Sequence, residues 1–296
     1  MRSGLLFGAG AYMMWGLFPA FFPLLKPAGA VEILAHRIIW SFALMVVVVA
    51  VVRRLGDLKQ IDRRTWLLLI AAAGLISANW LIYVYAVNNG HVVDAALGYF
   101  INPLVAIALG MVIFREKLNR WQVAALAVAV VAVVILTVQV GQPPLVGLGL
   151  ALSFALYGAV KKSVRTDPRV SVGLEAAIAT PFAVAYLVVL QSGENGTLTG
   201  HGAGHVALLI LSGVLTALPL LLFAAAAQRL AMVTLGLLFY VTPAMQLSWG
   251  VLVGGEPMPP MRWVGFALIW LALVVFTADA VRRTRAERRS SQPAPV

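Results

Sequence analysis

Long apolar stretches follow one another along nearly the whole chain and are interrupted only by short polar segments. A helix that crosses a hydrocarbon core about 30 Å thick needs roughly 17 to 25 mainly apolar residues, and most of these stretches are about that long. Because lipid cannot hydrogen-bond the backbone, only helices or closed β-barrels span it, and continuous rather than alternating apolar runs exclude the barrel. The sequence therefore predicts an all-α integral membrane protein.

The composition supports this prediction. With 61% apolar and 11% charged residues, the 296-residue chain cannot present the mixed charged surface of a soluble domain. The absence of cysteine excludes disulfides, thiolate metal sites and a cysteine nucleophile. The first apolar stretch is preceded only by Arg2 and lacks a convincing small-residue cleavage site, so we interpret it as a retained helix rather than a signal peptide.

We predict ten transmembrane helices, with boundaries accurate to about four residues. The expected spans are Gly4 to Leu25, Val31 to Val52, Trp66 to Val87, Asp94 to Phe114, Trp121 to Val138, Leu145 to Val160, Ser171 to Gln191, His205 to Ala227, Val233 to Val253 and Met261 to Ala280.

The net charge of +11 does not indicate nucleic-acid binding, because lysine and arginine lie in short loops between the apolar stretches. Positive residues concentrate in cytoplasmic loops. With a cytoplasmic N-terminus and ten spans, only Lys26, Arg37 and Arg262 of the 22 basic residues fall on the other side, so we expect both termini inside and a multi-pass protein of the plasma (inner) membrane. The other 19 are Arg2, Arg53, Arg54, Lys59, Arg63, Arg64, Arg115, Lys117, Arg120, Lys161, Lys162, Arg165, Arg169, Arg229, Arg282, Arg283, Arg285, Arg288 and Arg289.

Internal similarity divides the chain into halves. Residues 1–140 and 141–280 are predicted to be five-helix repeats, followed by a basic, disordered cytoplasmic tail at 281–296. A shift of 142 sets Trp15-Gly16 on Tyr157-Gly158, and a shift of 143 sets Glu32 on Glu175. A shift of 140 pairs Leu81 with Leu221, Ala86 with Ala226, Val93 with Val233, Leu97 with Leu237, Pro103 with Pro243, Gly110 with Gly250 and Glu116 with Glu256.

Five spans per repeat is an odd number, so the second half enters the membrane from the opposite side and the repeats are inverted. Two inverted halves around a central cavity are typical of carriers, because exchanging their conformations gives outward-open and inward-open states of similar energy. The predicted function is therefore a secondary transporter that works by alternating access.

Four segments of the sequence are specific enough to compare with known families. They are NWLIYVYAVNNGHVVDAALGYFINPLVAIALGMVIFREK from Asn79, WGLFPAFFPLLK from Trp15, EILAHRIIWS from Glu32 and ALPLLLFAAAAQRL from Ala217. These segments resemble the RarD proteins of the EamA branch of the drug/metabolite transporter superfamily. The resemblance implies a ten-helix plasma-membrane transporter, associated by name with chloramphenicol sensitivity, with relatives that export amino acids and other small metabolites.

Ionisable residues within a span indicate function by default, because charge is costly in lipid. Glu32 and His36 lie four residues apart on one helical face, next to Arg37. They are candidates for a gate or a coupling site, since His36 titrates near neutrality and Glu32 can take its proton. The alternative is an interfacial helix start, where Glu32 favours the helix dipole and Arg37 extends its charge to the interface. Glu175 is the repeat counterpart of Glu32 and a second candidate.

Uncharged polar and aromatic residues are candidates for the lining of the substrate cavity. Amides and phenols bind polar or zwitterionic solutes without net charge, and aromatic rings add stacking surface. The alternatives are hydrogen bonds between helices for the amides and interfacial anchoring for the tyrosines. The candidates are Trp15, Asn79, Tyr83, Tyr99, Asn102, Tyr157, Tyr240 and Gln246, with Asn88 and Thr242 beside them.

Helix breaks and helix ends supply further expectations. Pro103 and Pro243 each remove a helical hydrogen bond, so both helices are predicted to kink at matching points. Asp94 is interpreted as an N-cap. Glu256 ends its helix against the dipole, with Arg262 as its expected partner.

Other functional classes fit less well. No phosphate-binding G-x-x-x-x-G-K-[ST] run is present, which leaves an ion gradient or the solute's own gradient as the energy source. A channel remains open as an alternative, and so does a membrane-embedded enzyme, although no paired acids or nucleophile with a base support one. We expect no cofactor and no metal site. The expected partners are a small-molecule substrate, membrane lipid and a coupling proton or other ion. The pairs Gly4/Gly8 and Gly250/Gly254 suit either intramolecular packing or a homodimer.

Overall fold

The structure is a computed structural model, and it describes residues 2–54, 56, 61–114, 119–140, 143–164, 166–193, 195–227 and 238–290. Every regular element in these residues is a helix. The first half contains α1 (Arg2–Gly16), α2 (Phe18–Phe21), the 3-10 helix η1 (Phe22–Leu25), α3 (Ala30–Val51), α4 (Arg63–Asn88), α5 (Val92–Phe114) and α6 (Arg120–Val140). The second half contains α7 (Leu145–Ser163), α8 (Pro168–Ser192), α9 (Gly202–Ala227), α11 (Val241–Leu252) and α12 (Pro260–Ser290).

Four helices are long and apolar enough to cross a membrane: Ala30–Val51, Arg63–Asn88, Arg169–Ser192 and Gly202–Phe223. A fifth is formed if Ser3–Gly16 and Phe18–Leu25, bent by 41°, count as one broken span. Shorter apolar helices cover Val92–Asn102, Val123–Val138, Leu145–Lys161 and Pro260–Val275. The prediction of an all-helical protein is thus confirmed for the described residues, and several of their helices have the length and composition of membrane spans.

Local sequence sets two of the helix starts. Asp62 caps α4, and its carboxylate accepts a hydrogen bond from the Thr65 amide at 3.0 Å. Asp167 caps α8 in the same way through the Arg169 amide, with Pro168 at the first helical position. The Arg169 side chain also bonds this carboxylate, which lowers the pKa of Asp167.

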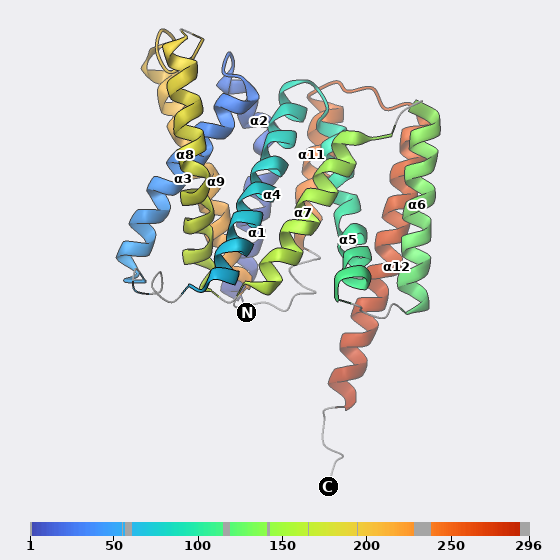
Figure 1. Ribbon diagram of the computed structural model, residues 1–296. Coiled ribbons are helices and arrows are strands. Elements are labelled where there is room, and N and C mark those ends of the chain that lie inside the picture. The colour runs from blue at the N-terminus through green and yellow to red at the C-terminus, as the bar shows by residue number, and fades with distance from the viewer. Residues whose placement is uncertain are drawn as a thin grey trace.

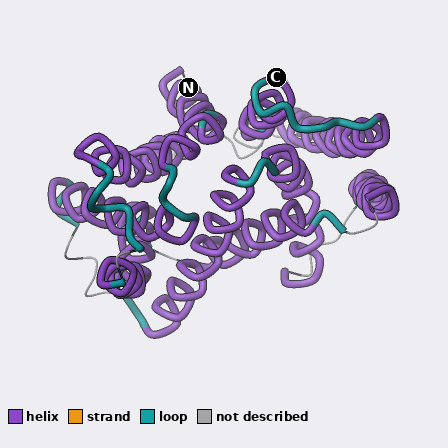
Figure 2. The backbone as a smooth tube through the Cα atoms, turned by 90° about the horizontal axis from the view of Figure 1, so that it is seen from above, coloured by secondary structure: helices purple, strands orange, loops and turns teal. Residues whose placement is uncertain are grey.

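The long helices run in alternate directions between a lower and an upper edge; α1 begins at the lower edge, and α12 extends below it (Figure 1). The pair α3 and α8 stands at one end of the bundle and the pair α6 and α12 at the other. In the view from above, the helices cross one another at an angle rather than standing parallel (Figure 2). The described helices are therefore tilted against one another.

Most of the main contacts between helices occur twice, the second time with each helix replaced by the one at the same place in the other half. Helix α3 packs on α9 as α8 packs on α4, and α1 packs on α9 as α7 packs on α4. Likewise α5 packs on α7 as α11 packs on α1. The remaining large contacts, α3 with α8, α5 with α11 and α6 with α12, join helices in equivalent positions of the two halves.

Glycines allow the closest of these contacts. A Cβ placed on Gly98 of α5 would lie 2.5 Å from the Gly147 carbonyl oxygen of α7. A Cβ on Gly213 of α9 would lie 2.2 Å from the Trp40 Cβ of α3. The backbones touch at both places, as small residues permit in membrane helix packing.

Two expectations about the upper edge were wrong. Asp94 does not cap α5, since it is the third residue of that helix and pairs with Arg262 at 3.1 Å. Glu256 provides the cap instead: its carboxylate accepts from the amides of Val92 at 2.6 Å and Val93 at 2.9 Å. It therefore stabilises the dipole of α5 rather than opposing that of its own helix. Burial raises the pKa of Glu256, although the two amide hydrogen bonds act in the opposite direction.

The C-terminal segment also differs from expectation. Helix α12 continues to Ser290, whereas the sequence interpretation makes residues 281–296 disordered. The segment from 281 to 290 contains neither Gly nor Pro, and half of its residues are Arg, a good helix former, so it extends an existing helix without the cost of nucleation. Residues 291–296 lie outside the described part of the chain.

Candidate functional site

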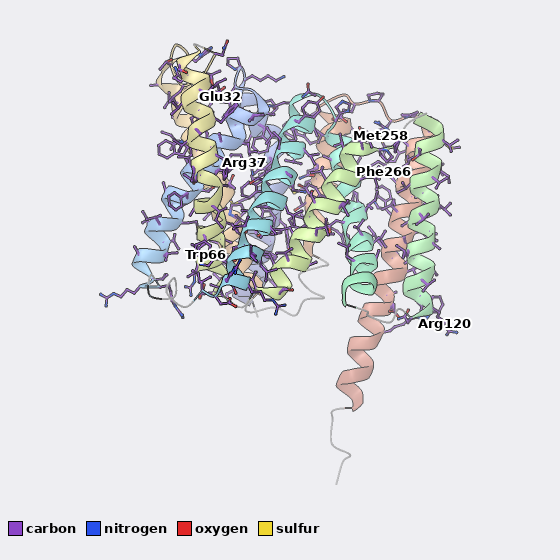
Figure 3. All side chains as sticks on the ribbon, in the orientation of Figure 1. Glu32, Arg37, Trp66, Arg120, Met258 and Phe266 are labelled. Atoms are coloured by element: carbon purple, nitrogen blue, oxygen red, sulfur yellow. The ribbon has the colours of Figure 1, made fainter. Side chains whose placement is uncertain are left out.

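Arg37 is the most deeply buried charge in the described structure, with 1% of its surface exposed. It lies on α3 below Glu32, away from the upper edge of the bundle (Figure 3). Its Nε donates to the Thr216 hydroxyl of α9 at 2.8 Å. Its guanidinium carbon lies 4.9 Å from the ring centroid of Phe22 and 4.8 Å from that of Trp80. Arg37 does not extend to the interface, so the structure places its charge among aromatic rings.

Glu32 is held at the upper edge by the segment between α8 and α9. One of its carboxylate oxygens accepts from the Thr197 amide at 2.7 Å and from the Thr197 hydroxyl at 3.0 Å. That hydroxyl also lies 2.8 Å from Nε2 of His205. His36 is buried on the same helix, and its Nε2 has no hydrogen-bond partner among the described residues. Glu32 therefore fastens α3 to the second half of the chain.

Asn79 connects three helices in the middle of the bundle. Its amide nitrogen donates to the Leu150 carbonyl and to the Ser153 hydroxyl of α7, both at 3.0 Å. Its carbonyl oxygen accepts from the Tyr99 hydroxyl of α5 at 3.3 Å. In this conformation Asn79 makes hydrogen bonds between helices, which is the alternative to cavity lining that the sequence leaves open for it. Its bond to the Tyr99 hydroxyl fixes the position of the Tyr99 ring.

A continuous series of aromatic contacts leads from Arg37 toward the lower edge. The ring centroids of Phe22 and Tyr83 are 5.9 Å apart, and those of Tyr83 and Tyr99 are 5.7 Å apart. Tyr99 contacts Phe154 at 6.3 Å, and Phe154 contacts Tyr157 at 6.0 Å. We call these five rings, Phe22, Tyr83, Tyr99, Phe154 and Tyr157, the aromatic path. Apart from Phe22 and Tyr83, these rings are only half-buried.

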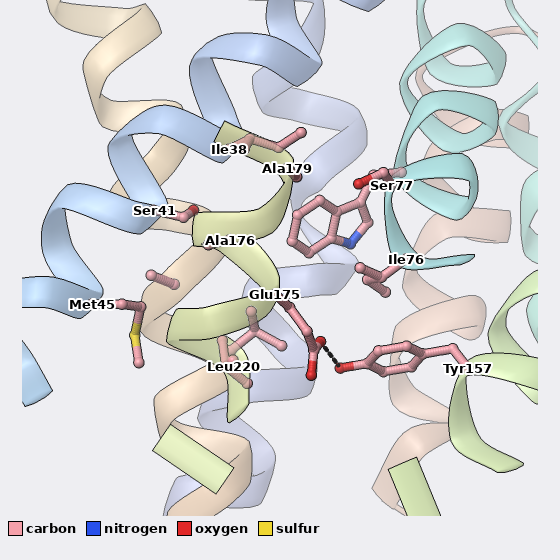
Figure 4. A pocket seen from close by; sticks show the side chains of 13 residues that line it. Ile38, Ser41, Met45, Ile76, Ser77, Tyr157, Glu175, Ala176, Ala179 and Leu220 are labelled. Atoms are coloured by element: carbon pink, nitrogen blue, oxygen red, sulfur yellow. Dashed lines mark hydrogen bonds between the residues drawn. The ribbon is translucent and has the colours of Figure 1, made fainter. Parts of the chain in front are cut away.

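The aromatic path ends at a charged cluster between α7 and α8. The Tyr157 hydroxyl donates to Oε2 of Glu175 at 3.0 Å (Figure 4). Lys161 lies 2.6 Å from Oε1 of the same carboxylate and also bonds Ser171, whose hydroxyl donates to Glu175 at 2.9 Å. Glu175 is 4% exposed, so this is a buried, hydrogen-bonded ion pair.

The candidates on α11 face the first helix. The amide nitrogen of Gln246 donates to the Trp15 carbonyl at 3.2 Å, and the Thr242 hydroxyl donates to the Tyr12 carbonyl at 2.8 Å. Tyr240 is the N-cap of α11 and is half-buried. These contacts join α1 to α11 across the two halves.

Comparison with known proteins decides the family. The model of the EamA-like transporter family matches this chain twice, at residues 2–138 and 143–278. The chain belongs to the EamA-like transporter family. It is 47% identical over 289 residues to the protein RarD of Streptomyces exfoliatus, covering 97% of this chain and 92% of that one. It is 41% identical over 292 residues to YojE of Bacillus subtilis, an uncharacterized transporter, covering 97% of both chains.

The fold is also found in a solved structure. A crystal structure with 16% sequence identity covers 95% of this chain and 99% of its own, with a TM-score of 0.63. The predicted resemblance to RarD proteins is thus confirmed, and this EamA-like protein is a membrane transporter of the drug/metabolite transporter superfamily.

Two adjoining cavities open between the helices of this EamA-like protein. One of about 20 Å³ is bordered by Trp80, Tyr157 and Glu175, and has room for little more than a water molecule (Figure 4). The other, of about 400 Å³, lies between α3, α4 and α8 and is almost entirely apolar. Ile38, Ser77 and Ala179 border both cavities.

The remaining candidates lie apart from this path. Asn102 is buried in α5 and makes none of the contacts described above. Pro103 lies within α5, which runs as one helix from Val92 to Phe114. Pro243 is the third residue of α11, and Tyr240 just before that helix forms a turn. Residues 228–237, which a shift of 140 pairs with residues 88–97, lie outside the described part of the chain.

The sequence does not single out several residues of the site, among them Phe22, Trp80, Ser153, Phe154, Lys161, Ser171, Thr197 and Thr216. Lys161 is expected in a cytoplasmic loop and Ser171 at a span boundary. A signal existed for two of them: Lys161 follows Tyr157 by four residues, and Ser171 precedes Glu175 by four, so each pair shares a helical face.

Proposed function

We propose that this EamA-like protein is a secondary carrier that exports a small metabolite, amino acid or drug by alternating access. The observation that carries the proposal is the aromatic path. It begins at a buried cation on α3, continues through residues of α4, α5 and α7, and ends at a buried ion pair between α7 and α8. Costly buried charges at both ends of a half-buried path favour a solute pathway over simple packing.

We also propose that residues 1–140 and 141–280 are inverted repeats with ten spans in all. The two matches to the family model support this division. The helix contacts support it as well, because the main contacts are kept when the helices of the first half are exchanged for those of the second: α1, α3, α4, α5 and α6 for α7, α8, α9, α11 and α12. In such an arrangement each half can adopt the conformation of the other, which supplies two states of similar energy.

The gates in this proposal lie at opposite edges. Glu32 with Thr197 closes the upper edge between α3 and the segment before α9. Its repeat counterpart Glu175 closes the lower edge with Lys161. Each state then requires that one carboxylate keeps its partners while the other releases them, which is the coupling role expected of these acids.

We infer that the lower edge is cytoplasmic, because the exposed arginines Arg53, Arg63, Arg64 and Arg120 lie there. The cysteine-free chain permits a direct measurement with single cysteines. A membrane-impermeant maleimide is expected to label Asn89→Cys and Ser192→Cys in intact cells. It should label Arg64→Cys and Thr166→Cys only after permeabilisation. If Arg64→Cys and Asn89→Cys were labelled from the same side of the membrane, or Thr166→Cys and Ser192→Cys were, the arrangement of ten alternating spans would be refuted.

Counterflow tests the carrier. Purified protein in liposomes is expected to take up labelled chloramphenicol or a labelled amino acid with saturation, and unlabelled solute inside should accelerate uptake several-fold, because the loaded carrier reorients with solute in both directions. Asn79→Ala should lower the rate, since it releases Tyr99 from its position on the path. Ser248→Ala, on the exposed side of α11, is the matched control. Linear uptake without acceleration would favour a channel.

A further inference from the structure

The guanidinium of Arg37 has no acidic partner among the described residues. Its Nε is occupied by Thr216, while Nη1 has no hydrogen-bond partner there. An arginine side chain stays charged in proteins and carries five donors. Aromatic faces attract it but accept no strong hydrogen bond. A full positive charge with free donors is thus kept inside the bundle.

The hydroxyl of Tyr83 is a second free donor at the same place. It is buried, and it has no partner among the described residues. Phe18 and Phe22 contact both groups: their ring centroids lie 5.5 and 4.9 Å from the Arg37 guanidinium carbon and 6.5 and 5.9 Å from the Tyr83 ring centroid. Donors outnumber acceptors here, so the missing group is an acceptor, and beside a guanidinium it is an anion.

The acidic side chains of the described residues do not fill this position. The hydrogen bonds to Glu32 come from Thr197, and those to Glu175 come from Tyr157, Lys161 and Ser171. The salt bridges of the described residues do not include Arg37. Since Lys161 neutralises Glu175, Arg37 is the unneutralised charge of the aromatic path.

We propose that the transported solute carries a carboxylate that binds Arg37 and Tyr83, with an aromatic or aliphatic body against Phe18, Phe22 and Trp80. The inference rests on the proposed carrier function and narrows its substrate class to organic monocarboxylates. Two guanidinium N–H groups and one hydroxyl match the two oxygens of a carboxylate. A neutral solute would leave the guanidinium without a counterion.

A solute can reach this site only if the aromatic rings that cover Arg37 move, and the bend between α1 and α2 allows such a movement. Phe18 and Phe22 belong to the short α2 and η1 segment, which is bent by 41° from α1. Tilting this segment removes two of the three rings from Arg37 without unwinding a long helix. The segment is the outer lid of the carboxylate site.

Matched acid and amide pairs test the proposal. Purified protein is titrated with phenylacetate and phenylacetamide, and with 4-methylpentanoate and its amide, by thermal stabilisation and by tryptophan fluorescence. The carboxylate of at least one pair is expected to bind about 10- to 100-fold more tightly than its amide, as charge-assisted hydrogen bonds predict. Wild-type protein that does not distinguish acid from amide in either pair, including failure to bind any of the four, overturns the proposal.

Variants locate the site. Arg37→Gln is expected to remove the preference for the acid, Arg37→Lys to retain part of it, and Tyr83→Phe to reduce it several-fold. Lys26→Gln, which removes an exposed cation between η1 and α3, should leave this preference unchanged. If Arg37→Gln does not fold, Arg37→Lys and Tyr83→Phe still decide, because an unchanged acid-to-amide ratio in both refutes the assignment. If the protein shows chloramphenicol counterflow but binds the acids no more tightly than their amides, the proposed carboxylate site is refuted and the carrier proposal stands.

Discussion

Gly98→Ala is expected to destabilise the protein by about 3 kcal/mol or more, because the new methyl group would overlap backbone that cannot rotate away. Its Cβ would lie 2.5 Å from the carbonyl oxygen and 2.8 Å from the Cα of Gly147. Helices α5 and α7, which share one of the largest contacts in the bundle, would have to separate. This separation would also move Tyr99 and Phe154, so the aromatic path would lose its middle contact.

The measurement is the midpoint of thermal unfolding in detergent, combined with size-exclusion chromatography. Gly74→Ala is the matched control, because its Cβ would meet nothing within 4 Å in the middle of α4. This control should be neutral or stabilising by up to about 1 kcal/mol, as alanine favours helix over glycine. Equal loss in both variants would show that the contact between Gly98 and Gly147 is not the cause.

Glu175→Gln is expected to lower both stability and transport, because it leaves the Lys161 ammonium without its carboxylate inside the bundle. Removing one member of a fully buried ion pair costs about 3–5 kcal/mol. The Lys161 side chain keeps 23% of its surface exposed, so solvent screening reduces the expected cost to about 1–2 kcal/mol. Counterflow should fall about ten-fold or more if the pair closes the lower gate.

A double-mutant cycle separates the charge from the packing. Lys161→Gln combined with Glu175→Gln should be less destabilised than the two single changes added together, because neither charge is left alone. Tyr157→Phe removes only the hydrogen bond to Oε2 and should cost about 1 kcal/mol or less. Strict additivity would mean that Lys161 and Glu175 are not coupled in the working protein.

The helical class and the position of most helices followed from the sequence because lipid leaves a chain few options. The expected start of the third span at Trp66 lies three residues inside α4, which begins at Arg63. The first expected span is broken between α1 and α2, in the segment that contains Pro19 and Pro23; of these two, Pro19 marks a possible bend in the sequence. A proline shows that a helix is weakened, but neighbouring helices decide whether it bends.

The site could be predicted only as a set of residue types. Apolar periodicity gives no angle between helices, so it could not show that Asn79 faces Ser153 or that Thr197 reaches Glu32. Lys161 and Glu175 are separated by 14 residues and a loop, and their pairing depends on the tilt of α7 against α8. The contacts that define the path are tertiary, and a single sequence does not record them.

The cap on α5 bears on how the protein is made. Its first two amides receive their hydrogen bonds from a carboxylate 164 and 163 residues further along the chain. During synthesis α5 therefore enters the bilayer long before Glu256 leaves the ribosome. The first two amides of α5 lack their hydrogen-bond acceptor until then. The N-terminal portion expressed alone would lack the Glu256 cap. We therefore expect it to assemble fully only when the C-terminal portion is present in the same membrane.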